Sequence, residues 1–144
     1  MSKALDANVL LYASDADSPL HTAALHVLED LAEGPELVYL FWPVAMAYLR
    51  IATHPSVFRE PLSRAQAEGN LGQLIERPHV RSPGERDGFW SAYRAAAQPA
   101  AARGNLVPDA HLVALMHQHG LSTILSRDRD FRRFDGIRVI DPFP

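Results

Sequence analysis

The 144-residue sequence contains no cysteine, and Lys3 is the only lysine among its 14 basic residues. Without cysteine, disulfides, thiolate metal sites and cysteine nucleophiles are excluded, so any metal must be held by oxygen or imidazole ligands. No hydrophobic run approaches the length of a membrane span, and the N-terminus lacks a signal-peptide pattern. We therefore expect a cytoplasmic protein without membrane contact.

Two phosphate-binding motifs are also missing. No glycine-rich loop with a lysine is present, which argues against P-loop NTPases, and no GxGxxG follows a strand, which argues against dinucleotide-binding enzymes. The net charge of -3 gives no broad attraction for nucleic acid, so an RNA substrate would require a local basic patch or a partner. The length and the 47% hydrophobic content predict one domain, residues 1–144, that buries a substantial core.

Strands alternate with helices along the chain, which predicts a parallel α/β fold. The expected strands are residues 3–12, 36–40, 79–82, 122–125 and 138–140. The expected helices are residues 18–33, 42–53, 63–76 with a capping box, 85–97 and 108–119, followed by a helical turn at 130–134.

Four aspartates, Asp6, Asp109, Asp128 and Asp130, stand where a strand is expected to end or a helix to begin. The carboxyl ends of parallel strands share one edge of the sheet, where open α/β folds bind their ligands. Several carboxylates gathered there repel one another, and a hard cation such as Mg²⁺ or Mn²⁺ relieves that repulsion. The pattern therefore predicts a metal-dependent enzyme.

Each aspartate also has a structural interpretation. Asp109 lies at a helix N-terminus, where the helix dipole favours aspartate in any protein and would keep its pKa low. Asp128 and Asp130 could form a solvated turn that pairs with nearby arginines. Asp6 is harder to explain, because a lone charge in an apolar strand is costly to bury.

Several neighbours of the aspartates are candidates for supporting roles. Asn8 would lie on the same strand face as Asp6 and hold its carboxylate. An equally good interpretation makes Asn8 a turn residue at the end of the strand. Ser126 would cap the turn or touch substrate. Arg127 and Arg129 are candidate phosphate contacts, together with the neighbouring arginines at 132 and 133.

The sequence resembles a PIN domain, and specifically the VapC toxins of bacterial VapBC toxin–antitoxin systems. Each motif alone is weak, but their order and spacing together are fairly specific. The resemblance rests on Asp6-x-Asn8, Tyr48-Leu49-Arg50-Ile51, Thr53-His54-Pro55, Gly104-Asn105-Leu106-Val107-Pro108-Asp109, Ser126-Arg127-Asp128-Arg129-Asp130-Phe131 and Asp141-Pro142.

This resemblance implies a three-layer α/β/α PIN fold and the toxin of a type II toxin–antitoxin system. The implied activity is a Mg²⁺- or Mn²⁺-dependent endoribonuclease, in which Asp6 and Asp109 are the main metal ligands and Asp128 or Asp130 completes the site. The implied partners are RNA, a VapB-type antitoxin and a second copy of the chain in a homodimer, with DNA contacted only through the antitoxin. The aromatic residues of the 85–97 helix offer apolar surface for such assembly.

One position departs from the family pattern. Most PIN domains carry a glutamate directly before the Tyr48-Leu49-Arg50 match, and here that position is Ala47. An alternative is therefore a catalytically weak or inactive PIN-like domain that binds RNA or an antitoxin without cutting. A phosphatase-like hydrolase with Asp6 as nucleophile is disfavoured, because Asn8 stands where a proton-donating acid would be expected.

Overall fold

A computed structural model describes residues 2–143, which form a five-stranded sheet in which every pair of neighbouring strands is parallel. The strands follow the spatial order β3-β2-β1-β4-β5. Their bounds are β1 Lys3–Leu5, β2 Val38–Tyr39, β3 Val80–Arg81, β4 Thr123–Leu125 and β5 Arg138–Ile140.

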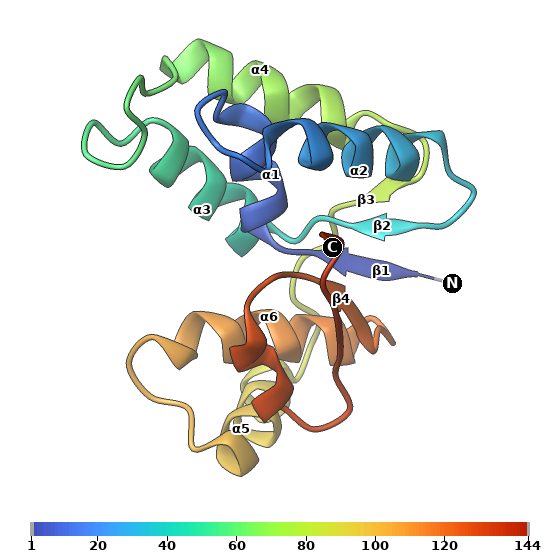
Figure 1. Cartoon of the computed structure of the whole chain (residues 1–144). Coiled ribbons are helices and arrows are strands. Elements are labelled where there is room, and N and C mark those ends of the chain that lie inside the picture. Colours follow the sequence, from blue (N-terminus) through green and yellow to red (C-terminus); the bar gives the residue numbers. More distant parts are fainter. Residues whose placement is uncertain (1, 144) are drawn as a thin grey trace.

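Helices cover both faces of the sheet, and Figure 1 shows α1 to α4 on one side with α5 and α6 on the other. The predicted α/β/α PIN architecture is confirmed. The helices are α1 Ala7–Ser14, α2 His21–Glu33, α3 Trp42–Ala52, α4 Arg64–Ile75, α5 Phe89–Ala100, α6 Leu106–Gln118 and the 3₁₀ helix η1 Arg129–Arg133. Between residues 2 and 143, no helix is long and apolar enough to cross a membrane.

Helix α6 packs beneath the sheet and is largely buried (Figure 1). Residues 112–116 of α6 are all buried, and Leu5 of β1 and Ile124 of β4 are fully buried above them. A helix that is apolar around most of its circumference needs cover on several sides, and α6 obtains it from the sheet, α5, α3 and η1. The N-terminal end of α6 is thereby held rigidly near the central strands.

The prediction of a strand over residues 3–12 is wrong beyond Leu5, because the chain turns at Asp6 into helix α1. The segment is a short apolar run, and such a run does not distinguish strand from helix by periodicity. Its composition favours a helix, since alanine and leucine predominate and Val9 is the only β-branched residue. Asp6 is therefore the N-cap of α1 and not a charge within a strand.

Other boundaries shift by a few residues. Helix α2 begins at His21, three residues after the expected start, and α6 begins at Leu106, two residues before it. Helix α5 starts only at Phe89, because Gly88 has a positive φ of 80° that interrupts the helical backbone. The predicted capping box of α4 is confirmed.

Candidate active site

The two central strands bring Asp6 and Ser126 together. Leu5 of β1 pairs with Leu125 of β4, so the next residue of each strand leaves the sheet beside the other. The Asp6 amide continues this ladder by donating to the Leu125 carbonyl at 3.1 Å. Two side chains that are 120 residues apart in sequence thus begin from adjacent, fixed backbone positions.

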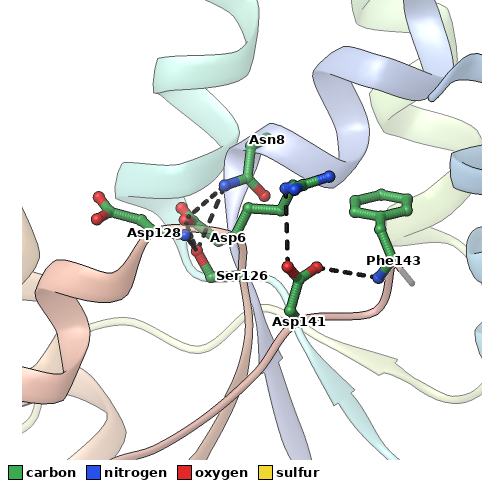
Figure 2. A network of polar contacts seen from close by, with 7 residues as sticks. Asp6, Asn8, Ser126, Asp128, Asp141 and Phe143 are labelled. Carbon is green, nitrogen blue, oxygen red and sulfur yellow. Dashed lines mark hydrogen bonds and ion pairs between the residues drawn. The ribbon is translucent and has the colours of Figure 1, made fainter. Parts of the chain in front are cut away.

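The Asp6 carboxylate is held by hydrogen bonds on both of its oxygens. Oδ1 accepts from the Ala7 amide at 2.8 Å, which caps α1, and Oδ2 accepts from the Ser126 hydroxyl at 2.5 Å (Figure 2). Ser126 Oγ also accepts from the Asp128 amide at 2.9 Å. Ser126 is fully buried, so its position supports an orienting role and not the expected contact with substrate.

Asn8 lies in the first turn of α1 and still faces Asp6, although the strand that was expected to place it there does not form. Its Nδ2 lies 3.4 Å from both Asp6 Oδ2 and Ser126 Oγ, a long separation for a hydrogen bond. Its Oδ1 is buried without a partner between residues 2 and 143. Unpaired buried acceptors are uncommon, so this atom is a candidate for contact with water or an ion.

The other three aspartates gather in space. Asp109 comes from the first turn of α6, Asp128 caps η1 by accepting from the Asp130 amide at 2.9 Å, and Asp130 lies in the first turn of η1. One carboxylate oxygen from each lies within 4.8 Å of the others, a separation that permits joint ligation of one cation. Asp6 is outside this set of three but close enough to act on Asp109 electrostatically.

Burial and mutual repulsion raise the pKa of two of these groups. Desolvation is the main cause for Asp109, followed by the charges of Asp128, Asp6 and Asp130, and it raises the Asp109 pKa to about 7. Burial also raises the pKa of Asp6, against the lowering effect of its hydrogen bonds from Ser126 and Ala7.

The expectation that the helix dipole keeps the pKa of Asp109 low is therefore wrong for the metal-free protein. The dipole contributes only about 0.3–1 kcal/mol at a helix end. Three neighbouring carboxylates in a half-buried site outweigh that contribution. A cation at this position would restore the ionised form.

A small cavity of about 120 Å³ opens between α3 and α6, with Asp6 and Asp109 in its wall. The remaining lining is largely apolar and includes Ala47 and Phe131. Ala47 thus faces the space between the two acids, at the position where the family pattern places a glutamate. The wall of this cavity therefore contains two carboxylates and, at residue 47, a methyl group in place of a third carboxylate.

The arginines of the 127–133 segment do not share one role. Arg127 Nε lies 3.7 Å from Asp141 Oδ2, and Arg133 Nε lies 3.6 Å from Asp130 Oδ1. Arg129 is exposed, and no carboxylate among residues 2–143 forms an ion pair with it. The alternative interpretation, in which these arginines pair with Asp128 and Asp130 in a solvated turn, is met among residues 2–143 by Arg133 alone.

Sequence reasoning assigned no role to the C-terminal residues Asp141 and Phe143, which adjoin this site. Asp141 belongs to a motif that carries the family resemblance, and that was the only available signal. The aromatic ring of Phe143 is buried, which a proline-rich C-terminal segment does not indicate.

The PIN domain family model matches residues 3–137 of the chain. The chain is 54% identical over 143 residues to Ribonuclease VapC48 of Mycobacterium tuberculosis, with 99% of each chain covered. It is 38% identical to Ribonuclease VapC43 of the same species, with 96% of this chain and 93% of that one covered.

Solved structures agree on the fold. VapBC2 from Rickettsia felis, bound to a promoter DNA fragment, matches with a TM-score of 0.68 at 15% identity, covering 97% of this chain and 98% of that one. VapC20 of Mycobacterium tuberculosis, described as a toxin that cleaves the sarcin-ricin loop, matches with a TM-score of 0.66 at 16% identity, covering 96% and 99%. The family model and the two relatives, matched over nearly their full lengths, show that this chain belongs to the VapC family of PIN-domain proteins.

Proposed function

We propose that this protein is the toxin of a type II toxin–antitoxin system and cleaves RNA phosphodiester bonds with the help of Mg²⁺ or Mn²⁺. The observation that carries the proposal is the convergence of Asp6, Asp109, Asp128 and Asp130 at one edge of the sheet. It is supported by the 54% identity to a relative that is named a ribonuclease. Three separate segments of the chain supply these acids, and the carboxylates lie close together although their charges repel one another.

The residues present fit a hard divalent cation. All candidate ligands are oxygens, and three of them lie within 4.8 Å of one another. Burial first, and then the charges of Asp128, Asp6 and Asp130, raise the pKa of Asp109, and a cation would offset both effects. We propose Asp6, Asp109 and Asp128 as the ligands of the cation, with Asp130 beside them in the group of three neighbouring carboxylates. When bound, Mg²⁺ or Mn²⁺ supplies a water of lowered pKa and offsets charge on the scissile phosphate.

The protein residues divide the remaining tasks. Ser126 and the Ala7 amide hold the Asp6 carboxylate in one orientation, so its lone pairs are directed before any ligand arrives. Asp109 carries a proton on its carboxyl group for part of the time near neutral pH and releases it when a cation binds. The Asn8 amide group lies beside the Asp6 carboxylate, with its Nδ2 3.4 Å from Asp6 Oδ2.

RNA must approach a protein of net negative charge, so its phosphate contacts have to be concentrated near the site. Arg129 is the best candidate in the segment, because it is exposed, adjoins Asp128 and Asp130, and has no carboxylate partner in the described chain. The buried hydroxyl of Ser126 is assigned to Asp6 instead of to substrate.

We assign the protein to the cytoplasm, as one domain over residues 1–144 in a homodimer that binds a VapB-type antitoxin and reaches DNA only through it. Solved VapBC2 from Rickettsia felis supports the antitoxin, since it is described as bound to promoter DNA. On the surface of α5, Trp90 is 69% exposed and stacks parallel to Tyr93 at 5.8 Å. This aromatic pair is our candidate for a dimer contact.

Ala47 favours a second candidate function, a PIN-like domain that binds RNA or antitoxin without cutting. One experiment separates the two. The purified protein is incubated with RNA in EDTA, in Mg²⁺ and in Mn²⁺, beside an Asp109→Asn variant. We expect cleavage only by the native protein with added metal. RNA that stays intact under all conditions, although the protein binds it, would favour the non-cutting alternative.

A further inference from the structure

The Arg127 side chain faces away from the cluster of aspartates although both of its sequence neighbours belong to the site. Its Nε lies 3.7 Å from Asp141 Oδ2, and its Cζ lies 5.7 Å from the centre of the Phe143 ring, within the range of a cation–π contact. Figure 2 shows Asp141 and Phe143 beside Asp6, Asn8 and Ser126, on the chain that follows β5. The guanidinium is therefore directed to the C-terminal segment.

That segment is itself anchored to the body of the protein. The Phe143 ring is 5% exposed and packs edge-on against Tyr12 of α1, with the ring centres 5.6 Å apart. The Phe143 amide donates to Asp141 Oδ1 at 3.0 Å, which orients the carboxylate whose other oxygen faces Arg127. Asp141 is thus held in place before it contacts the arginine.

The contact can act on the site through the backbone on either side of Arg127. Ser126 holds the Asp6 carboxylate, and the Asp128 amide donates to the same Ser126 hydroxyl. A rotation of the peptide units around residue 127 would move the Ser126 hydroxyl and the Asp128 carboxylate together. The backbone provides a second link between this turn and the C-terminal segment, since the Ser126 amide donates at 3.0 Å to the carbonyl of Ile140, the residue before Asp141.

We propose that Arg127, Asp141 and Phe143 form a positioning clamp that holds the 126–128 turn in the geometry needed for metal binding. This inference rests on the proposed metal-dependent function and deepens it. It removes Arg127 from the expected phosphate contacts and leaves that task to Arg129. The clamp residues touch neither substrate nor metal, and they act through Ser126 and Asp128.

The test compares Arg127→Gln, Asp141→Asn and the double variant. The control is Arg64→Gln, which breaks an exposed ion pair with Glu68 on α4. Mn²⁺ affinity is measured by calorimetry without RNA, and kcat and KM are measured with an RNA oligonucleotide at several salt concentrations. Melting temperatures should change little in all variants, because exposed ion pairs contribute little to stability.

We expect each clamp variant to bind Mn²⁺ about tenfold more weakly than the native protein, as is typical when residues that orient metal ligands are changed. The kcat should fall while KM and its salt dependence stay constant. The double variant should be no worse than either single variant, because both substitutions break one interaction. The Arg64→Gln control should match the native protein.

Two results would overturn the clamp. One is native Mn²⁺ affinity and native kcat in both single variants. The other is a raised KM with a flatter salt dependence in Arg127→Gln but not in Asp141→Asn, which would assign Arg127 to phosphate. If the native protein binds Mn²⁺ but cuts no RNA, the proposed function fails while the Mn²⁺ affinities still decide the clamp. Absence of Mn²⁺ binding by the native protein would overturn both.

Discussion

Replacing Asp109 by asparagine should abolish RNA cleavage and at the same time stabilise the metal-free protein. The amide has nearly the volume of the carboxyl group but carries no charge. In the native protein without metal, ionised Asp109 is half-buried and is repelled by Asp128, Asp6 and Asp130. The substitution removes this repulsion together with a proposed metal ligand.

The magnitude follows from the pKa of Asp109, which folding raises from 3.8 to about 7. The folded protein binds this proton more tightly than the unfolded chain, so stability falls as the pH rises through this window and levels off above it. Taken in full, the difference in pKa (7 − 3.8) lowers the free energy of unfolding above pH 7 by about 4 kcal/mol, at about 1.4 kcal/mol per pKa unit. Because Asp109 is only half-buried, solvent screening reduces this to about 1–2 kcal/mol.

Thermal unfolding in EDTA, followed by circular dichroism at about pH 5 and about pH 8, measures the effect. The asparagine variant should melt about 3–6 °C above the native protein at the higher pH. At the lower pH the gap should narrow, because Asp109 is then protonated in the native fold. Added Mn²⁺ should raise the melting temperature of the native protein more than that of the variant. A gap that is absent or independent of pH would refute the argument from carboxylate repulsion.

Three further predictions address other parts of the site. Asp6→Asn and Asp6→Ala should both lose cleavage, but the alanine variant should be about 1 kcal/mol less stable than the asparagine variant, because asparagine caps helices as well as aspartate does. Equal melting temperatures for the two variants would contradict the capping role. Ala47→Glu should bind Mn²⁺ more tightly in calorimetry and lower the stability in EDTA, because it adds a carboxylate to the cavity wall; an unchanged Mn²⁺ affinity would place residue 47 outside the metal site. Arg129→Gln should weaken RNA binding and reduce the slope of the logarithm of the RNA-binding constant against the logarithm of salt concentration by about 1. Native affinity and slope in this variant would direct the search for the RNA path to Arg50 and Arg59.

The sequence predicted the parallel fold, because strands that alternate with helices are a strong signal. The structure also brings the four candidate aspartates near one another, while their role as metal ligands stays a prediction. It failed at residues 7–12, where the periodicity of one short apolar run fits a strand or a helix and the capping bond from the Ala7 amide to Asp6 begins the helix. The pKa of Asp109 was also out of reach, since it depends on burial and on three neighbouring charges, which arise only in the folded chain. The contact of Arg127 with Asp141 and Phe143 was missed for the same reason, as it joins β4 to the C-terminal segment.

The Asp6 side chain caps helix α1, whereas among residues 2–143 no side chain, that of Asp109 included, makes a capping hydrogen bond at the start of α6. This difference bears on how such a toxin is lost by mutation. A population that carries an unrestrained growth inhibitor selects for variants without activity. Changes of Asp6 to residues that cannot cap a helix would also destabilise the fold. The destabilised protein would then bind less antitoxin. Changes at Asp109 relieve repulsion instead. Escape variants that persist as folded, antitoxin-binding proteins should therefore accumulate at Asp109 more often than at Asp6.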